Sequence, residues 1–238
     1  TYNPNNRTRL SGESLRNRAI TDTFEPGSTL KPFTVATGLD AGRIRPETTI
    51  QTAPGSHTIG NATIHDAHAE GLLTVAQVIQ KSSNVGAAKI ALSLPAELMW
   101  DMFHSVGFGA QPQLGFPGEA VGRVRPAKSW RPIEQATMAY GHGISVSLIQ
   151  LARAYSIFAR DGELLPTSLV KLDTPPPAQH VIAPDTARAI RAMLEMAVRP
   201  GGTAPRAQIM GYRVAGKTGT AHKQEHGGYA ANKYVASF

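Results

Sequence analysis

The stretch Glu25-Pro26-Gly27-Ser28-Thr29-Leu30-Lys31-Pro32-Phe33 decides how this chain folds. Apolar residues continue after it at helical spacing and stop near Gly42, which predicts a helix. Pro32 marks the start of that helix, because a proline has no N–H and is tolerated only in the first turn. Ser28 therefore lies at the helix N-terminus, where free N–H groups favour developing negative charge. Lys31 follows three residues later on the same face, so Ser28 is a candidate activated nucleophile.

The composition is that of a folded protein with a sizeable core. The chain has 238 residues, of which 41% are hydrophobic and 17% charged, and this excludes a disordered chain. No apolar run approaches the 18 residues of a membrane span, and the absence of cysteine excludes disulfides and thiol catalysis. The net charge is +7, but the arginines are scattered and are not interleaved with aromatic residues. We therefore expect an ordinary solvated basic surface and no nucleic-acid partner.

Helical segments dominate the rest of the sequence. Helical spacing and capping signals predict helices over residues 74–81, 85–91, 95–107 and 147–161, a short one ending at residue 140, and another over 184–199. Turn-forming residues predict loops, with short strands at most, over residues 43–71 and 107–132. Strands are predicted over residues 164–172, 212–221 and 233–238, whereas residues 1–24 are polar and show no strand alternation.

Three short motifs occur in one order along the chain. The spacing Ser-x-x-Lys appears at Ser28 and again at Ser168, and on its own it is weak support for an active site. Only the first copy is followed by both Ser82-Ser83-Asn84, at a predicted helix break, and Lys217-Thr218-Gly219, on a predicted strand. This trio resembles the signature of penicillin-binding proteins and class A β-lactamases.

Longer segments extend the resemblance over nearly the whole chain. They resemble the class B penicillin-binding proteins of the cell-division type, such as the penicillin-binding proteins 3 of Gram-negative bacteria. The similar segments are residues 18–33, 79–86, 140–143 and 211–220. The resemblance implies an α+β or α/β serine transpeptidase fold, in which an antiparallel sheet is flanked by a large helical subdomain. Residues 1–238 are then one transpeptidase domain, which we expect to be incomplete at both ends and to lack its terminal strands.

The resemblance also implies an activity and its catalytic residues. The family's D,D-transpeptidases cross-link the stem peptides of septal peptidoglycan through a serine acyl-enzyme, without a cofactor or metal, and are the targets of β-lactams. Ser28 would attack the bond between two D-alanines, Lys31 would accept its proton and Ser82 would relay a proton to the leaving amine. Because Lys31 must be neutral for this step, burial and the second cation at Lys217 would have to lower its pKa.

Substrate-binding residues follow from the same motifs. Asn84 would hold the substrate's amide, and the strand Lys217, Thr218, Gly219 and Thr220 would bind the terminal carboxylate. The N–H groups of Ser28 and Thr220 would form the oxyanion hole. The family also places residues similar to four aromatic side chains around the cleft, where they serve as wall or core rather than in the chemistry. These four are Tyr140, His142, Tyr229 and Tyr234.

The partners and location are implied by resemblance alone. The expected ligands are stem peptides ending in D-Ala-D-Ala and β-lactam antibiotics. Other expected partners are divisome proteins, including a lipid II polymerase. The expected location is the periplasmic face of the inner membrane, with an anchoring N-terminal helix that lies outside this segment.

Three other functions compete with this one. A serine β-lactamase shares the acylation step, but its deacylating Glu-x-x-x-Asn spacing occurs here only at Glu13–Asn17, before the nucleophile. A non-catalytic penicillin-sensing domain stays open as an alternative. The pattern His222-Lys223-Gln224-Glu225-His226 matches a zinc peptidase motif, yet it follows a predicted strand and runs into glycines, which favours a hairpin loop over a helical metal site. His65-x-x-His68 is an equally weak metal motif.

Overall fold

The computed structural model describes Asn5, residues 12–225 and residues 228–238. The helices are α1 (Gly12–Leu15), α2 (Arg18–Thr21), α3 (Lys31–Asp40), α4 (Val75–Lys81), α5 (Asn84–Leu92), α6 (Ala96–Ser105), α7 (Pro132–Met138), α8 (Leu148–Ala159) and α9 (Pro184–Ala197). The strands are β1 (Thr23–Phe24), β2 (Thr49–Gln51), β3 (Ser56–Ile59), β4 (Ala62–His65), β5 (Leu72–Thr74), β6 (Val146–Ser147), β7 (Glu163–Leu164), β8 (Gln179–His180), β9 (Gly219–Glu225) and β10 (Gly228–Ser237). Within the described ranges, no helix has the length and apolar character that crossing a bilayer requires.

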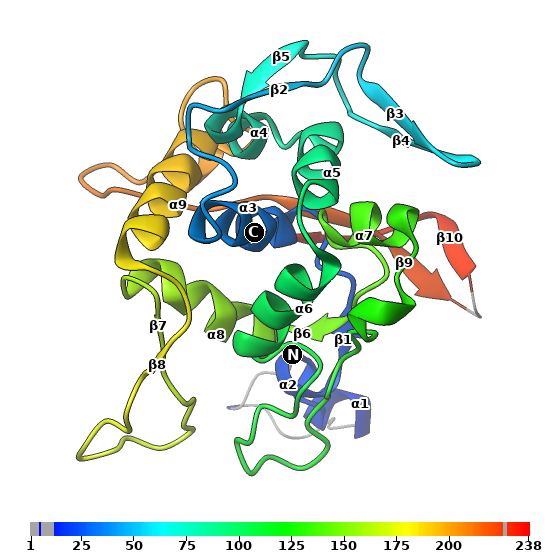
Figure 1. Cartoon of the computed structure of the whole chain (residues 1–238). Helices are drawn as coiled ribbons and strands as arrows, with labels where there is room; N and C mark the ends of the chain where they lie inside the picture. Colours follow the sequence, from blue (N-terminus) through cyan, green and yellow to red (C-terminus); the bar gives the residue numbers. More distant parts are fainter. Residues whose placement is uncertain (1–4, 6–11, 226–227) are drawn as a thin grey trace.

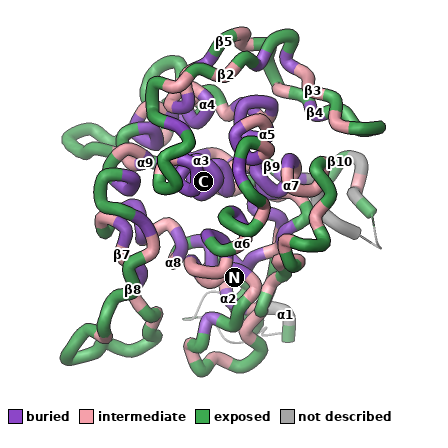
Figure 2. Tube along the Cα trace, viewed as in Figure 1, coloured by how far each residue is buried: buried purple, intermediate pink, exposed green. Residues whose placement is uncertain are grey.

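Helix α3 is the centre of the helical body (Figure 1). It is buried from Lys31 to Gly38, and α4, α5, α6 and α9 pack against it. Its Phe33 ring lies 5.5 Å from Phe108, 5.3 Å from Tyr155 and 5.0 Å from Phe158. Figure 2 shows the buried residues gathered around α3, with exposed residues along the outer hairpins. Burying aromatic rings of this size is strongly favourable, so the start of α3 has a well-fixed position.

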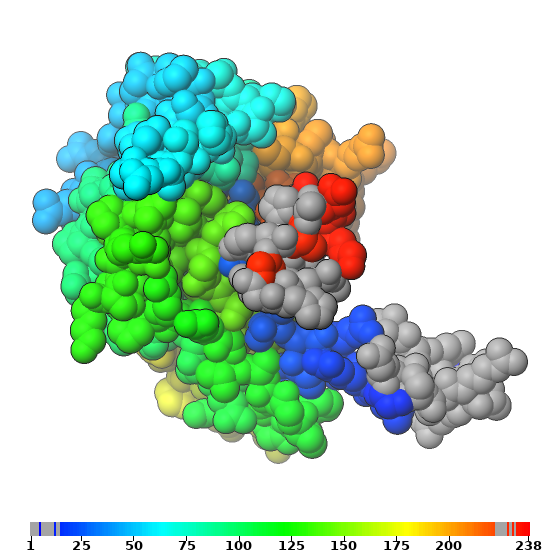
Figure 3. All heavy atoms as spheres, turned by 90° about the vertical axis from the view of Figure 1, so that its right-hand side faces the viewer, coloured from blue at the N-terminus to red at the C-terminus, as the bar shows by residue number. Residues whose placement is uncertain are grey.

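The strands form two-stranded antiparallel sheets around this body. Four of the pairs are short: β1 with β6, β2 with β5, β3 with β4, and β7 with β8. The longest is the β9–β10 hairpin, in which Gly219 pairs with Ser237 and Ala221 with Val235. Figure 3 shows the face of the molecule on which β10 (red) lies, with the β3–β4 region (cyan) above it. The expected α+β architecture is confirmed.

Most predicted helices begin where their capping residues indicate. Thr74 Oγ1 accepts a hydrogen bond from Gln77 N (3.1 Å), and Thr74 N donates one to Gln77 Oε1 (2.9 Å), which starts α4. Ser147 and Gln150 form the same reciprocal pair at the start of α8. Such capping boxes satisfy two backbone N–H groups that a helix end leaves free, which is why they can be recognised from sequence.

Three local predictions were wrong. The strand predicted over residues 164–172 ends at Leu164, because Pro166 lacks a donor and Ser168 Oγ bonds Val170 O (2.7 Å) and Val170 N (3.1 Å) in a turn. The strand predicted over residues 212–221 begins only at Gly219, where its pairing with β10 begins. Ser28 does not start the α-helix itself but lies in a one-turn 3-10 helix, Gly27–Leu30, directly before it.

Candidate active site

Ser28 lies in a turn that is fixed from both sides. Gly27 adopts a left-handed φ of 58°, which a residue with a side chain adopts only at a cost. Within the turn, Thr29 Oγ1 donates to Pro26 O (2.7 Å), and the buried Tyr155 hydroxyl donates to Thr29 O (2.7 Å). These contacts hold the Ser28 hydroxyl against the first residue of α3. The sequence motif gave no sign of the Tyr155 contact, which comes from α8.

Lys31 is the most enclosed charged side chain of the site. Its residue is 0% exposed, and Nζ donates to Ser28 Oγ (2.9 Å), Ser82 Oγ (3.0 Å) and Asn84 Oδ1 (2.8 Å). Burial lowers the pKa of Lys31 well below its usual value, and the positive charge of Lys217 lowers it further. The carboxylate of Asp66 opposes both effects. The structure thus places the Ser28 hydroxyl beside an amine that is easily deprotonated.

Lys217 approaches the Ser82 hydroxyl from the segment that directly precedes β9. Its Nζ donates to Ser82 Oγ (2.8 Å) and to Thr218 O (3.0 Å), and its residue is only 1% exposed. Burial lowers the pKa of Lys217 to about 8. Ser82 Oγ therefore lies between two lysine amines, one from α3 and one from the segment before β9.

Asp66 holds the Ser82 region in place and was missed by sequence reasoning. Ser82 ends α4 in the left-handed region (φ 60°), which is costly for a residue with a Cβ. Asp66 binds the three residues that follow Ser82. It accepts hydrogen bonds from Ser83 Oγ (2.7 Å), Asn84 N and Val85 N (2.9 Å). A lone aspartate in a loop belongs to no motif, and only the fold brings it to the start of α5.

Asn84 faces both the lysine and the β4 edge. Its Oδ1 accepts from Lys31 Nζ, and its Nδ2 donates to His65 O (2.9 Å). Because both ends of the amide have partners, the side chain has a defined orientation. A peptide amide of a ligand placed beside Asn84 would compete with Lys31 Nζ and His65 O for the Asn84 side chain.

Strand β9 lies directly against the turn of residues 26–30 that carries the candidate nucleophile Ser28, called the nucleophile turn below. A Cβ on Gly219 would lie 2.7 Å from Pro26 O, and one on Gly27 would lie 2.8 Å from Thr220 O. Only glycine permits these approaches, so the two glycines bring the Thr220 backbone next to Ser28. Thr218 Oγ1 accepts a hydrogen bond from Lys217 Nζ (3.4 Å) and shares another with Thr203 Oγ1 (2.8 Å).

The aromatic residues predicted for the cleft wall divide into two groups. The Tyr140 ring centroid lies 6.0 Å from Lys31 Nζ and 5.2 Å from the His142 ring, so both belong to the site. Tyr229 and Tyr234 lie on β10, opposite Gln224 and His222. The Tyr234 residue is 56% exposed, and the Tyr229 side chain is outside the described part.

A second missed residue, Glu25, connects the Tyr140–Gly143 segment to the nucleophile turn. Its Oε1 accepts from Gly143 N (2.8 Å), and Gly27 N donates to Gly141 O (3.3 Å). A Cβ on Gly141 would lie 2.4 Å from Gly27 N, so the two backbones are in direct contact. The motif stretch contains Glu25, but nothing in the spacing indicates its partner.

The proposed zinc motif does not form a helical site. His222 lies on β9, which corrects the expected loop, and His226 falls outside the described residues. Over residues 12–225 and 228–238, no group of three metal-binding side chains occurs.

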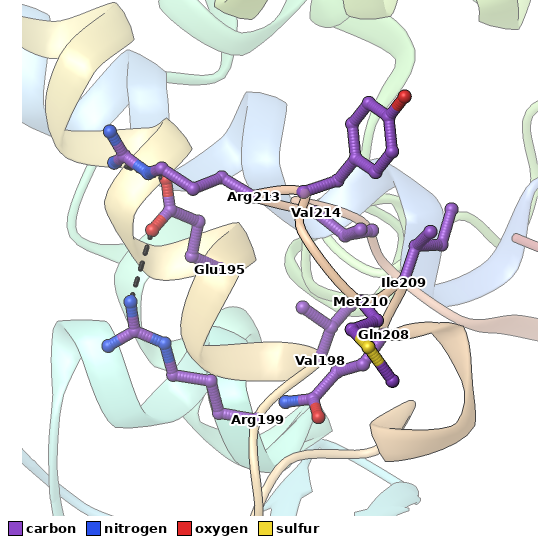
Figure 4. A pocket seen from close by; sticks show the side chains of 9 residues that line it. Glu195, Val198, Arg199, Gln208, Ile209, Met210, Arg213 and Val214 are labelled. Atoms are coloured by element: carbon purple, nitrogen blue, oxygen red, sulfur yellow. Dashed lines mark hydrogen bonds and ion pairs between the residues drawn. The ribbon is translucent and has the colours of Figure 1, made fainter.

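A cavity of about 420 Å³ lies away from these residues, between α9 and residues 208–214 (Figure 4). On its wall Glu195 binds Arg213 (2.6 Å) and Arg199 (3.2 Å), and close by Gly216 N donates to Leu194 O (3.2 Å). No predicted site residue lines this cavity. The ion pair of Glu195 with Arg213 and the Gly216–Leu194 hydrogen bond attach the segment that leads into Lys217 to α9.

The fold and the geometry together define a class of protein. A helical body carries a serine beside a buried lysine, and the segment that leads into β9 closes on it with a second lysine. This is the arrangement of active-serine enzymes that use lysine as a base.

Comparisons with known proteins identify the family. The model of the penicillin binding protein transpeptidase domain matches residues 1–238, and the chain belongs to this family. It is 44% identical over 237 residues to the probable peptidoglycan D,D-transpeptidase PenA of Neisseria gonorrhoeae, covering 100% of this chain and 40% of the relative. It is 41% identical over 235 residues to the peptidoglycan D,D-transpeptidase FtsI of Escherichia coli K12, covering 99% of this chain and 40% of the relative.

A solved structure gives the same result. The apo transpeptidase domain of penicillin-binding protein 3 from Burkholderia pseudomallei superposes with a TM-score of 0.90 at 53% identity. The match covers 93% of this chain and 67% of that one. The expected class and fold are therefore confirmed, while the chain spans only 40% of the length of the two curated relatives.

Proposed function

We propose that this chain is the catalytic part of a peptidoglycan D,D-transpeptidase that cross-links stem peptides during septal cell-wall synthesis. The observation that carries the proposal is the contact of Ser28 Oγ with the buried Lys31 Nζ at 2.9 Å. Because burial disfavours the ammonium form, Lys31 is available as a base near neutral pH. The names of the relatives support the same activity.

Acylation begins with proton transfer from Ser28 to neutral Lys31. The Ser28 oxygen bonds to the carbonyl carbon between the two D-alanines, and the carbonyl oxygen becomes an oxyanion. The N–H groups of Ser28 and Thr220 stabilise it, since losing one such donor costs about 3 kcal/mol in comparable sites. The C–N bond then breaks, and the leaving D-alanine amine takes a proton that Ser82 relays from the lysines.

Deacylation repeats these steps with a different amine. The amine of a second stem peptide attacks the ester carbonyl and loses its proton to Lys31. The C–O bond to Ser28 breaks, the serine oxygen recovers a proton, and the new amide is the cross-link. In the preceding acylation step, Asn84 orients the donor's amide, while Lys217, Thr218 and Thr220, beside Gly219, bind the terminal carboxylate that then leaves with the D-alanine.

β-Lactams occupy the same site, because their amide resembles the D-Ala-D-Ala bond. The remaining partners follow from family membership: divisome proteins, including a lipid II polymerase, at the periplasmic face of the inner membrane. An N-terminal anchor outside this segment would attach the natural protein there.

Acylation by penicillin tests the assignment of the nucleophile. Intact mass and peptide mapping are expected to find one adduct, on Ser28, and none in Ser28→Ala. The Ser168→Ala variant is the matched control and keeps the adduct. An adduct on Ser168, or one that survives Ser28→Ala, contradicts the proposal.

Two further measurements separate the competing functions. The adduct is expected to persist for hours, since the one Glu-x-x-x-Asn spacing of the sequence, Glu13–Asn17, precedes Ser28 and so does not match the deacylating glutamate of class A β-lactamases. Loss within seconds would indicate a β-lactamase. Turnover of a D-Ala-D-Ala peptide, followed by released D-alanine, is expected of a transpeptidase and not of a penicillin sensor.

A further inference from the structure

A polar hollow lies beside Gly143, at the end of the Tyr140–Gly143 segment. Its volume is about 240 Å³, and it is lined by Glu25, Arg123, Arg125 and residues 143–145. None of the residues of the motif trio lines it, and its two arginines belong to none of the three motifs. The volume is sufficient for a carboxylate and the groups next to it.

Of the two arginines that line the hollow, only Arg125 has an ion pair among the described residues. Glu134 binds both Arg125 (2.9 Å) and Arg131 (3.4 Å), and its bond from the Arg131 N–H helps to hold the pKa of Glu134 at about 2, so it is ionised at neutral pH. Among the ion pairs of the described residues, none involves Arg123, whose residue is exposed. An arginine presents a planar set of donors that matches a carboxylate.

The walls of the hollow are held by backbone contacts. Arg123 N donates to Ser145 O (2.8 Å) and Ser145 N donates to Arg123 O (3.0 Å), which forms an isolated antiparallel bridge. Next to it, Trp130 Nε1 donates to Arg125 O (2.9 Å). Arg123 therefore extends from a fixed backbone, so a ligand does not have to order the loop that carries it.

The hollow is directly connected to the nucleophile turn. Gly143, which lines it, is bonded to Glu25, three residues before Ser28. Gly141 in the same segment contacts Gly27, and Tyr140 faces Lys31. The Tyr140–Gly143 segment thus contacts the hollow through Gly143 and the Ser28–Lys31 region through Gly141 and Tyr140.

We infer that Arg123 and the hollow beside it bind a carboxylate of the peptide substrate, separate from the terminal carboxylate that Lys217 binds. This inference rests on the proposed transpeptidase function. The carboxylate belongs either to the donor peptide or to the acceptor peptide, and the two sources are distinguished by kinetics. In both cases the ligand is an acidic peptide, as the unmatched guanidinium requires.

The test compares Arg123→Gln with wild type in the full-length protein. Arg43→Gln is the matched control, because it removes the same charge from an exposed position beyond the far end of α3. Donor and acceptor stem peptides are each used with free side-chain carboxylates and as the corresponding carboxamides; the donor's terminal carboxylate is kept. We expect Arg123→Gln to lower kcat/KM about 10-fold for one carboxylate peptide, as a lost charge-assisted hydrogen bond would. The carboxamide form of that peptide is expected to react at the same rate with wild type and with Arg123→Gln.

Each outcome has one meaning. A loss in release of D-alanine assigns the carboxylate to the donor, and a loss only in partitioning of the acyl-enzyme to added amine assigns it to the acceptor. Arg123→Lys is expected to retain part of the rate and serves in place of Arg123→Gln if that variant does not fold. Rates equal to those of Arg43→Gln, or an equal loss with the carboxamides, overturn the inference. Penicillin acylation of Ser28 is read separately: its absence in wild type refutes the proposed function itself.

Discussion

The charge of Lys217 is expected to control the pH at which Lys31 acts, and Lys217→Met tests this. In the structure both lysine amines donate to Ser82 Oγ, at 3.0 Å from Lys31 and 2.8 Å from Lys217. The positive charge of Lys217 makes protonation of Lys31 less favourable and so lowers the pKa of Lys31. Removing that charge therefore leaves more of Lys31 in the ammonium form, which cannot accept the proton of Ser28.

The size of the effect follows from the geometry. Two bonds of 3.0 and 2.8 Å to one oxygen place the two nitrogens no more than their sum, about 6 Å, apart. At an effective dielectric constant of about 20, two unit charges at about 6 Å repel by about 3 kcal/mol. That energy corresponds to a factor of about 100 in the ratio of neutral to protonated Lys31.

The assay is the rate of penicillin acylation between pH 5 and pH 10 (roughly the range in which such groups titrate). In wild type the rate rises with pH as Lys31 loses its proton. In Lys217→Met this rise is expected at higher pH, so that the rate at neutral pH falls by up to about 100-fold from this effect alone. Loss of carboxylate binding lowers the rate further, chiefly below about pH 8, where wild-type Lys217 carries its charge.

Two controls separate the charge from the side chain. Lys217→Arg keeps a positive charge and is expected to keep the wild-type pH dependence even if its rate is lower. Lys171→Met removes a charge from an exposed turn and is expected to change nothing. If Lys217→Met lowers the rate without moving the rise, Lys217 acts only by binding substrate and the reasoning is refuted.

Three other predictions concern stability and assembly of the site. Asp66→Ala removes three hydrogen bonds at the start of α5 and is expected to lower the free energy of unfolding in denaturant by about 2 kcal/mol and to slow acylation, whereas Asp66→Asn keeps an acceptor and loses less. The free energy of unfolding is expected to increase as the pH rises from about 8 toward the ordinary lysine value, because unfolded Lys217 binds a proton that folded Lys217 has released; a titration showing the same increase in Lys217→Met would contradict this. Gly141→Ala would place a Cβ 2.2 Å from Gly27 O at a φ of 84° and is expected to reduce acylation more than 10-fold, on the order of 1.4 kcal/mol or more, while Gly115→Ala, with φ 70° and open space, keeps its acylation rate.

The sequence was informative where structure depends on neighbouring residues. Capping boxes at Thr74 and Ser147 act over three residues, so both helix starts were predicted correctly. Pro32 placed the start of α3 to within one residue for the same reason. The family and fold could be recognised because the motif trio occurs in the correct order on these local elements.

The sequence was uninformative where structure depends on distant contacts. Asp66 and Glu25 bind backbone N–H groups of segments 18 and 118 residues away, and no short pattern encodes such pairs. The strand predicted from residue 212 failed because strand formation requires a partner, and the pairing with β10 starts only at Gly219. Residues 164–172 have apolar residues but no partner beyond β8, so Ser168 forms its own turn instead.

The two Ser-x-x-Lys copies show what this spacing lacks by itself. In both, the sequence places a hydroxyl three residues before an amine, and both lie in folded parts of the chain. At Ser168 the hydroxyl bonds the local backbone, and Lys171 is exposed to water, which stabilises its charge. At Ser28 the amine is removed from water by α3 and its neighbours, and a second cation is brought close by β9. Since both effects come from tertiary packing, an isolated helix with the Ser28 sequence would keep its lysine protonated, and the reactive pair exists only when the helical body and the β9–β10 hairpin are folded together.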